Sequence, residues 1–158
     1  MASGINPSSA CIGMFASIIL ATTQVMAEDI GAWQYGCEAD RCSLAQAASS
    51  ADNRTAVKIN IVRRDKGLFA LIVTPLGISL PGGILMRVDQ GPEERAVFAT
   101  CNIGGCFSAV PLDANRLARW KRGVTLRISY VDGSGSKIEN ELSLDGVTAG
   151  LQRLENGD

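Results

Sequence analysis

The sequence predicts an all-β domain, and three observations support this fold class. Apolar and polar residues alternate with a period of two in several short runs, which is the pattern of strands with one buried face. Turn-forming segments such as Asp65-Lys66-Gly67 and Asp132-Gly133-Ser134-Gly135 separate these runs. The strands do not alternate with long helices, so a parallel sheet of βαβ units is not expected. The pattern is typical of a β-sandwich or a β-barrel.

The expected strands follow one another along most of the chain. The first is predicted near Trp33–Cys37, and the following segment Ala45–Arg54, rich in Ala, Ser, Gln and Asn, is interpreted as a linker or exposed loop. Leu68–Val73 is apolar throughout, so we expect both of its faces to be covered. In the last strand, Asn140 is the one polar residue on the predicted inner face. The remaining strands are predicted at 57–61, 84–88, 125–130 and 138–144, and on either side of the pair Cys101 and Cys106.

Two short helices interrupt the strands. Asp113 is a suitable N-cap for a helix over Ala114–Lys121, whose inward side would contain Leu117 and Trp120. Near the C-terminus, apolar residues repeat at the helical spacing i, i+4 and i+7, at Val147, Leu151 and Leu154. We expect this second helix to lie on the sheet.

The N-terminal segment has the pattern of a secretory signal peptide. No Asp, Glu, Lys or Arg precedes Glu28, and Ile12–Ala21 is an apolar run of 10 residues. This run is shorter than a membrane-spanning helix, which needs about 20 apolar residues. Val25-Met26-Ala27 fits a small-x-small cleavage site. The chain is therefore divided into a signal peptide, 1–27, and a single domain, 28–158, with a buried N-terminal helix or a membrane anchor as the alternative.

The overall composition excludes several classes of function. The 158 residues contain 15 Lys+Arg and 16 Asp+Glu, which is not the strongly basic balance of a nucleic-acid-binding protein. The sequence has no histidine, which excludes Ser-His-Asp and Cys-His catalytic arrangements and His-ligated metals. No cofactor is expected.

Four cysteines follow the predicted cleavage site, in two pairs of the same C-x4-C spacing: Cys37 with Cys42 and Cys101 with Cys106. An even number of cysteines in an exported protein predicts disulfides, and four cysteines allow three connectivities. Pairing of Cys101 with Cys106 is favoured, because Gly104-Gly105 between them suits a tight hairpin turn. Local pairing is accordingly the favoured connectivity for both C-x4-C segments. A zinc site is the alternative, although zinc pairs are usually C-x2-C. The spacing also differs from the redox motif C-x-x-C.

Several segments occur in a specific order along the chain. They are Trp33-x3-Cys37, Thr74–Gly83, Val88-Asp89, Phe98-x-x-Cys101, Gly105-Cys106, Val110–Leu112, Glu141–Gly146 and Ala149–Leu154. This ordered set resembles the invasion-associated locus B family of exported alphaproteobacterial proteins. The resemblance implies an immunoglobulin-like antiparallel β-sandwich with one or two short helices and, for some members, a part in host-cell invasion. It also implies an envelope location: we expect the periplasm, with outer-membrane association or secretion as alternatives.

The same resemblance points to structural rather than catalytic roles. The family has no established catalytic residues, and the motif positions interpreted as structural are Trp33, Pro75, Gly77, Leu80, Gly82, Val88, Asp89 and Gly105. Within Thr74–Gly83, two prolines and three glycines would also suit a binding loop. We favour the simpler interpretation that Leu76, Ile78 and Leu80 pack into the sandwich, while Pro and Gly shape the turns.

Two groups of cations are candidate binding surfaces. One consists of Arg116, Arg119, Lys121 and Arg122, on or beside the first predicted helix, and the other of Arg63, Arg64 and Lys66. Either group would suit anionic lipid head groups, polysaccharide or an acidic protein partner. The alternative is a solvated surface without a partner.

The candidate catalytic residues do not form a recognisable constellation. Glu93-Glu94 follows a Gly-Pro turn, and Glu139 and Glu141 share the outer face of one strand, so neither pair resembles the buried acid of a glycosidase. Ser79 lacks the sequence context of a nucleophile elbow. We therefore predict a non-enzymatic protein that contacts an unidentified envelope or host-surface macromolecule. A histidine-independent hydrolase or transferase and a chaperone-like periplasmic factor are the alternatives.

Overall fold

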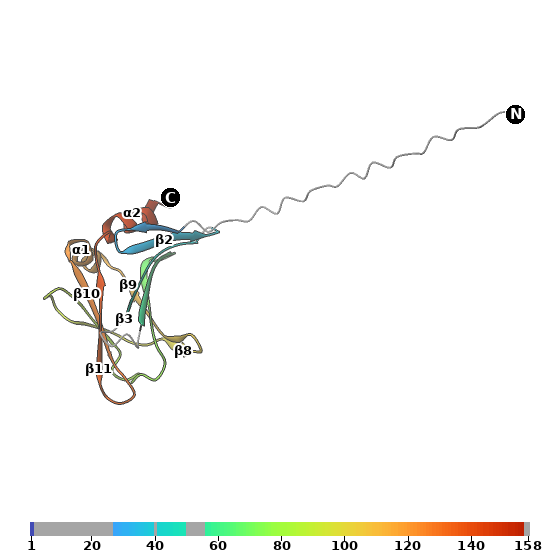
Figure 1. Ribbon diagram of the computed structural model, residues 1–158. Helices are drawn as coiled ribbons and strands as arrows, with labels where there is room; N and C mark the ends of the chain where they lie inside the picture. Colours follow the sequence, from blue (N-terminus) through green and yellow to red (C-terminus); the bar gives the residue numbers. More distant parts are fainter. Residues whose placement is uncertain (2–26, 40, 50–55, 157–158) are drawn as a thin grey trace.

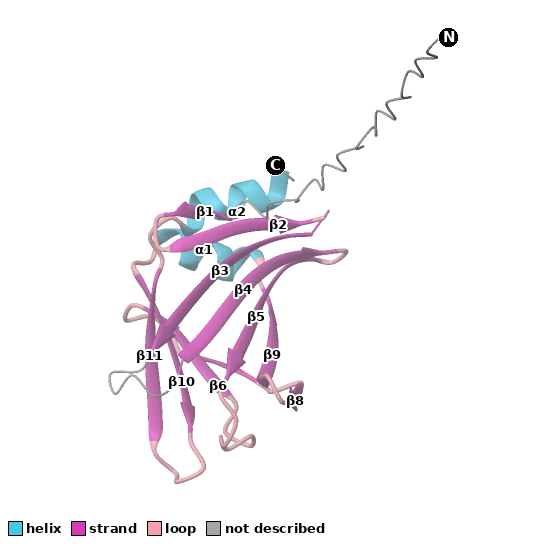
Figure 2. Cartoon of the chain, turned by 45° about the vertical axis from the view of Figure 1, so that its right-hand side comes forward, coloured by secondary structure: helices cyan, strands magenta, loops and turns pink. Residues whose placement is uncertain are grey.

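The computed structural model describes Met1 and residues 27–39, 41–49 and 56–156, which form two antiparallel β-sheets and two short helices (Figures 1 and 2). The larger sheet has seven strands in the order β1-β2-β3-β4-β5-β9-β8, and the smaller sheet has four in the order β11-β10-β6-β7. The predicted all-β sandwich, which the family resemblance described as immunoglobulin-like, is confirmed.

Consecutive strands are neighbours in most of the larger sheet, where β1 to β5 form an antiparallel meander. This sheet contains β1 (Ala27–Ile30), β2 (Trp33–Glu38), β3 (Arg41–Ser49), β4 (Ala56–Arg64), β5 (Gly67–Thr74), β9 (Gly105–Pro111) and β8 (Thr100–Asn102). The smaller sheet contains β11 (Lys137–Ser143), β10 (Thr125–Val131), β6 (Ile84–Val88) and β7 (Glu94–Ala96). Because β5 and β6 belong to different sheets, the segment between them crosses from one sheet to the other.

The hydrophobic core lies between the inner faces of the two sheets. Its most buried members include Trp33, Leu44, Ile59, Ile61, Ile72, Leu126, Ile128 and Leu142. Trp33 also joins the sheets, because its Nε1 donates a hydrogen bond to the carbonyl oxygen of Ser143 at 3.0 Å. The Gln46 side chain donates to the same carbonyl and accepts from the Ser143 amide. Asn140 is buried on the inner face, as the alternation predicted.

Both helices cover one end of the sandwich, which we call the helical end and which lies at the top of Figure 2. Helix α1 (Ala114–Arg122) begins after the N-cap Asp113, whose carboxylate accepts from the Arg116 amide at 2.8 Å, and it buries Trp120. Helix α2 (Val147–Asn156) buries Val147, Gly150, Leu151 and Leu154. The two predicted helices are confirmed.

Two predictions for the larger sheet are wrong. Residues 45–49 of the predicted loop Ala45–Arg54 belong to β3, and 50–55 lie outside the described residues. Ala and Gln are weak strand formers, but β3 is hydrogen-bonded to β2 and to β4, so tertiary pairing overrides composition. The segment Leu68–Val73 is covered on one face only. The second sheet packs on its inner face, so Phe69, Leu71 and Val73 stay partly exposed on the outer face.

The predicted signal peptide lies almost entirely outside the described residues, and its cleavage stays a prediction. Its last residue, Ala27, is the first residue of the edge strand β1 and pairs with Gly36. Cleavage after Ala27 would leave Glu28 as the first residue of this strand. Neither helix in the described part of the chain is long and apolar enough to cross a membrane.

Candidate functional site: an apolar loop end and two groups of cations

The loops opposite the helices form the second end of the sandwich, which we call the loop end. It consists of 75–83 between β5 and β6, 97–99 between β7 and β8, the β8–β9 turn 103–104 and the β10–β11 turn 132–136. Figure 2 shows these connections toward the lower part of the molecule, away from α1 and α2. The loop end therefore collects segments from both sheets.

Backbone hydrogen bonds tie the long loop 75–83 to the smaller sheet. The Ser79 amide donates to the Val131 carbonyl oxygen at 2.8 Å, and the Gly133 amide donates to the Gly77 carbonyl oxygen at 2.7 Å. Both bonds reach β10 or the turn that follows it. The loop thus has a defined conformation although it lies at the surface.

The start of β6 and the end of β7 hold the other side of the same loop. The Arg95 guanidinium donates to the carbonyl oxygen of Gly82 at 3.0 Å and also to that of Pro81. Gly83 has a φ of +69°, and a Cβ added there would lie 2.5 Å from the Ala96 carbonyl oxygen. A glycine is therefore required at this crossing between the sheets.

Four large apolar side chains are exposed at the loop end. They are Leu76, Leu80, Val97 and Ile103, with exposed fractions of 55%, 49%, 70% and 101%. The prediction that Leu76 and Leu80 pack into the sandwich is therefore wrong, whereas Ile78 does pack against the core. The prediction assumed an extended segment with all three residues on one face. Gly77 instead has a φ of +80°, which breaks the period-two alternation.

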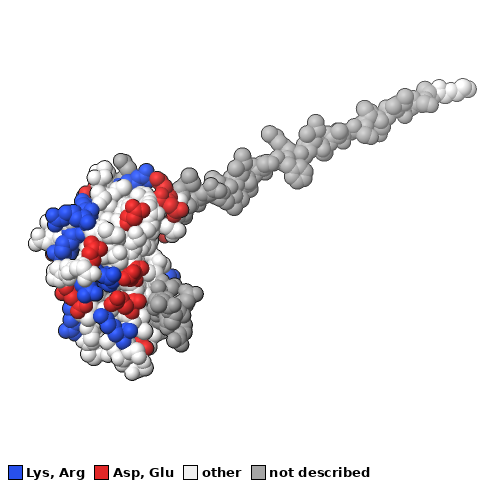
Figure 3. Space-filling model, turned by 60° about the vertical axis from the view of Figure 1, so that its left-hand side comes forward, with Lys and Arg blue, Asp and Glu red and all other residues white. Residues whose placement is uncertain are grey.

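The loop end carries almost no charge. The segments 74–86 and 96–112 contain no charged residue, and Asp132 is the one charged residue of the turn 132–136. Figure 3 shows charged side chains over the upper and middle parts of one face, while the lowest part is almost entirely white. Contiguous exposed apolar patches typically mark interaction sites. The four exposed apolar side chains, all at this end, make the loop end a candidate for such a site. Val97 and Ile103 were not among the predicted site residues, although the uncharged run 96–112 was a signal for them.

The Cys101–Cys106 disulfide closes the β8–β9 hairpin of the loop end. The two cysteines are directly opposite each other in the ladder, with their Cα atoms 4.0 Å apart. Gly105 has a φ of +131°, and a Cβ added there would lie 2.4 Å from the Thr74 carbonyl oxygen. The favoured local pairing is therefore present. The positive φ occurs at Gly105 and not at Gly104.

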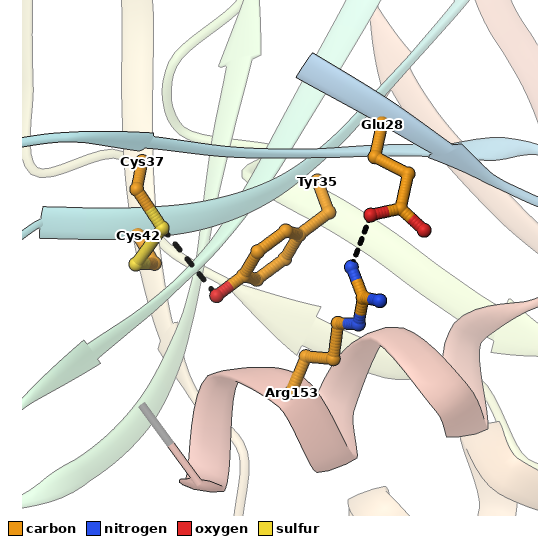
Figure 4. Close-up of a disulfide and its surroundings, with 5 residues drawn as sticks. All are labelled: Glu28, Tyr35, Cys37, Cys42 and Arg153. Carbon is orange, nitrogen blue, oxygen red and sulfur yellow. Dashed lines mark hydrogen bonds and ion pairs between the residues drawn. A yellow bond between two sulfur atoms is a disulfide. The ribbon is translucent and has the colours of Figure 1, made fainter. Parts of the chain in front are cut away.

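The Cys37–Cys42 disulfide joins β2 to β3 at the other end of the larger sheet, again with local pairing (Figure 4). The Tyr35 hydroxyl lies 3.4 Å from the Cys37 Sγ and is the donor, because a disulfide sulfur carries no hydrogen. Arg153 of α2 forms an ion pair with Glu28 and places its guanidinium 5.6 Å from the Tyr35 ring centre. Helix α2 is thus attached to the β1–β2 hairpin near this disulfide.

Only two of the four cations predicted as a binding surface on α1 are without an ion pair to a described carboxylate. The Arg116 Nε lies 2.6 Å from one oxygen of the Glu94 carboxylate, and Arg119 pairs with the other oxygen. Both arginine side chains are partly buried in this arrangement. Lys121 and Arg122 are exposed and form no ion pair with a described carboxylate. Half of the predicted group therefore connects α1 to β7 and is not free to bind a partner.

The second group of cations lies at the β4–β5 hairpin, beside a cleft of about 540 Å³. Arg63 and Arg64 line this cleft, Lys66 does not, and Arg41 from β3 lines its opposite side. Arg41 was not predicted as a site residue. Within the described residues, none of these four cations forms an ion pair.

The family-motif residues have two kinds of location. Asp89, at a φ of +49°, accepts hydrogen bonds from the amides of Val124 and Thr125 and joins the end of β6 to the start of β10. Trp33 and Val88 also pack at the helical end. The motif positions in the loop end or at its border are Pro75, Gly77, Leu80, Gly82 and Gly105.

The candidate catalytic side chains are not arranged for acid–base chemistry. Glu94 is held by two arginines, and Glu139 and Glu141 are exposed beside Arg127. Hydrogen bonds from the Ser134 hydroxyl and the backbone of Ser136 lower the pKa of Asp132 below its ordinary value, whereas a general acid needs a raised pKa. In the described ranges, no three Cys, Asp or Glu side chains are grouped to hold a metal ion.

Comparison with known proteins identifies the family. The pattern of the family described as Invasion associated locus B (IalB) protein matches residues 33–155. Invasion protein B homologs from Brucella abortus strain 2308 and from biovar 1 strain 9-941 are each 24% identical over 151 residues, covering 91% of this chain and 87% of the relative. The crystal structure of invasion associated protein b from Bartonella henselae has the same fold, with a TM-score of 0.72 at 23% identity over 83% of this chain and 96% of that chain. The chain therefore belongs to the invasion associated locus B family.

Proposed function

We propose that the chain is exported to the cell envelope and binds another macromolecule through its loop end, without catalysing a reaction. Three features support export and an envelope role. The N-terminal segment has the pattern of a signal peptide. The two disulfides are typical of compartments outside the cytosol. The chain also belongs to a family described by its association with invasion.

The single observation that carries the binding role is the set of exposed apolar side chains at the loop end. Full burial of one Leu, Ile or Val side chain contributes about 1.5–3 kcal/mol. Four such side chains on one uncharged end therefore offset much of the cost of holding two molecules together. Charged surface residues usually limit unwanted association, and Asp132 is the one charged residue in the segments that form this end.

The conformation of the loop end is also fixed by contacts within the protein, so its surface is preformed. The disulfide closes the β8–β9 hairpin, and hydrogen bonds fix loop 75–83 to β7 and β10. Binding to a preformed surface loses less conformational entropy than binding to a flexible one. This favours contact with a partner over a role as a flexible linker.

The test is site-specific photo-crosslinking in living cells, with a photoreactive amino acid in place of Leu80 or Ile103. Val124 is the matched control, because it is an apolar residue at the helical end whose exposed fraction of 72% lies between those of Leu80 and Ile103. We expect discrete crosslinked species from positions 80 and 103 and none from position 124. Equal labelling from all three positions, or none from any, contradicts the loop-end contact.

The role in invasion is part of the proposal, and it comes from the names of the Brucella and Bartonella relatives. A strain that lacks the protein should be complemented by the wild type and only weakly by the double variant Leu76→Ser/Leu80→Ser. Host-cell entry is the measurement, with the amount of exported protein as the control. Full complementation by the double variant would show that invasion does not require the exposed leucines of the loop end.

The enzymatic alternative is tested directly. Purified protein is assayed against peptidoglycan and ester substrates, and we expect no turnover. Turnover that disappears in Ser79→Ala would show that Ser79 is a nucleophile and would replace the binding proposal.

A further inference from the structure

The two cation-bearing hairpins of the larger sheet separate at one end and leave a cleft between them. The β3–β4 ladder stops at Ser43↔Val62, although both strands continue beyond this pair. Beyond it, Arg41 and Cys42 pair only with β2, and the last residues of β4 pair only with β5. The cleft of about 540 Å³ lies where the two hairpins diverge.

Three guanidinium groups surround this cleft. Arg41 comes from β3, and Arg63 and Arg64 come from β4. Arg63 donates to the backbone carbonyl of Glu155, and the Arg64 guanidinium lies 6.0 Å from the ring centre of Phe69. No carboxylate side chain lines the cleft, so its positive charge is not neutralised by the described residues. Arginine is well suited to bind phosphate through paired hydrogen bonds.

An apolar hollow continues from the cleft along the outer face of the sheet. This hollow of about 290 Å³ shares Arg64 and Leu71 with the cleft and extends over Phe107 and Ala109 of β9. It lies on the face of β5 that remains partly exposed, contrary to the sequence-based expectation. A charged site and an apolar site are therefore joined end to end.

We propose that the cleft and the hollow together bind an anionic single-chain lipid with a phosphate head group. The phosphate lies between Arg41 and Arg64, and the hydrocarbon chain runs across Leu71 toward Phe107. Free phosphate would leave the apolar hollow unused, and an uncharged chain would leave the arginines unused. The far end of the hollow borders the loop end at Ala99, Thr100 and Asn102. The arginines of the cleft lie outside the loop end, so the inference does not depend on the proposed function.

The probe is tetradecyl phosphate below its critical micelle concentration, added to the disulfide-bonded protein and followed by calorimetry. Inorganic phosphate tests the head group alone, and tetradecyltrimethylammonium tests the chain with the opposite charge. We expect saturable binding of tetradecyl phosphate to one site, with both other compounds binding at least about tenfold more weakly. Equal binding of the cationic analogue overturns the role of the arginines, and equal binding of inorganic phosphate overturns the role of the hollow.

Charge-removing variants locate the site. Arg64→Gln and Arg41→Gln should each weaken binding of tetradecyl phosphate by roughly tenfold. Lys66→Gln is the matched control, because it removes one cation from the same hairpin but does not line the cleft. A similar loss in Lys66→Gln would mean that the lipid responds only to net charge and would overturn the site.

Amide chemical shifts provide a readout that does not require variants. On titration with tetradecyl phosphate, the largest changes are expected at residues 41–42, 62–64 and 71 and along β9. Changes that concentrate at loop 75–83 or at the turn 132–136, or the absence of any change, would contradict the proposal.

Discussion

The two ends of the sandwich use their side chains in opposite ways. At the helical end, charged groups are engaged inside the molecule: Glu94 holds two arginines of α1, and Asp89 accepts hydrogen bonds from two backbone amides. At the loop end, Leu80 and Ile103 are among the large apolar side chains that face solvent. The density of charges in a sequence segment therefore does not show where a charged surface is available. The helical end is held by these internal contacts, whereas the loop end exposes apolar side chains through which we propose that the protein binds a partner.

The largest expected difference between the two ends is in the stability loss caused by substituting a glycine at each end. The two glycines have similar backbone conformations. Gly146, at the helical end, has a φ of +83°, and an added Cβ would lie 2.0 Å from the Ile30 carbonyl oxygen. Gly77, at the loop end, has a φ of +80° and no heavy atom within 4 Å of an added Cβ. Gly146→Ala should lower the free energy of unfolding by about 3 kcal/mol or more, because it adds a clash to the strain of positive φ. Gly77→Ala should lower it by ~1 kcal/mol, because only the strain remains. Urea denaturation followed by circular dichroism is the measurement, and equal losses would contradict the contrast.

An intermediate effect is expected from the ion pairs of the helical end. Glu94→Gln leaves two partly buried guanidinium groups without their carboxylate and should lower the free energy of unfolding by about 1–2 kcal/mol. Glu141→Gln is the control, because Glu141 also pairs with an arginine but is 57% exposed. Its loss should stay below ~0.5 kcal/mol. Similar losses in both variants would show that Glu94 has no special role in attaching α1.

The smallest effect on stability is expected at the loop end. Leu76→Ser and Leu80→Ser should each lower the free energy of unfolding by about 1 kcal/mol or less, because half of each side chain is already exposed. Leu126→Ser in the core is the comparison, with an expected loss of several kcal/mol. A decrease of several kcal/mol in the free energy of unfolding of the Leu76 or Leu80 variant would mean that these residues stabilise the fold. It would contradict the proposal that they are exposed to bind a partner.

Features with local signals were predictable from the sequence. Helix α1 begins after Asp113 and ends at Gly123 because capping residues act within one helical turn. The disulfide pairing within each C-x4-C segment follows from the hairpins that bring Cys37 opposite Cys42 and Cys101 opposite Cys106.

Features that depend on distant partners were not predictable in the same way. Strand β3 has a composition unlike a strand and forms because β2 and β4 hydrogen-bond to it and Leu44 packs against Gly150 of α2. The same limit applies to the candidate site. The helix cations were identified by residue type, but only the fold shows that Arg116 and Arg119 share Glu94.

The amino-acid sequence by itself determined the all-β class and the two helices and favoured the local cysteine pairs, because alternation, capping and tight turns act over a few residues. The tertiary structure decided which leucines of loop 75–83 face solvent and which arginines gather at the cleft without an ion pair to any described residue. These outcomes depend on the crossing of β5 to β6 between sheets and on the divergence of two hairpins. Both arise from packing between segments that are far apart in the chain, so no local pattern encodes them.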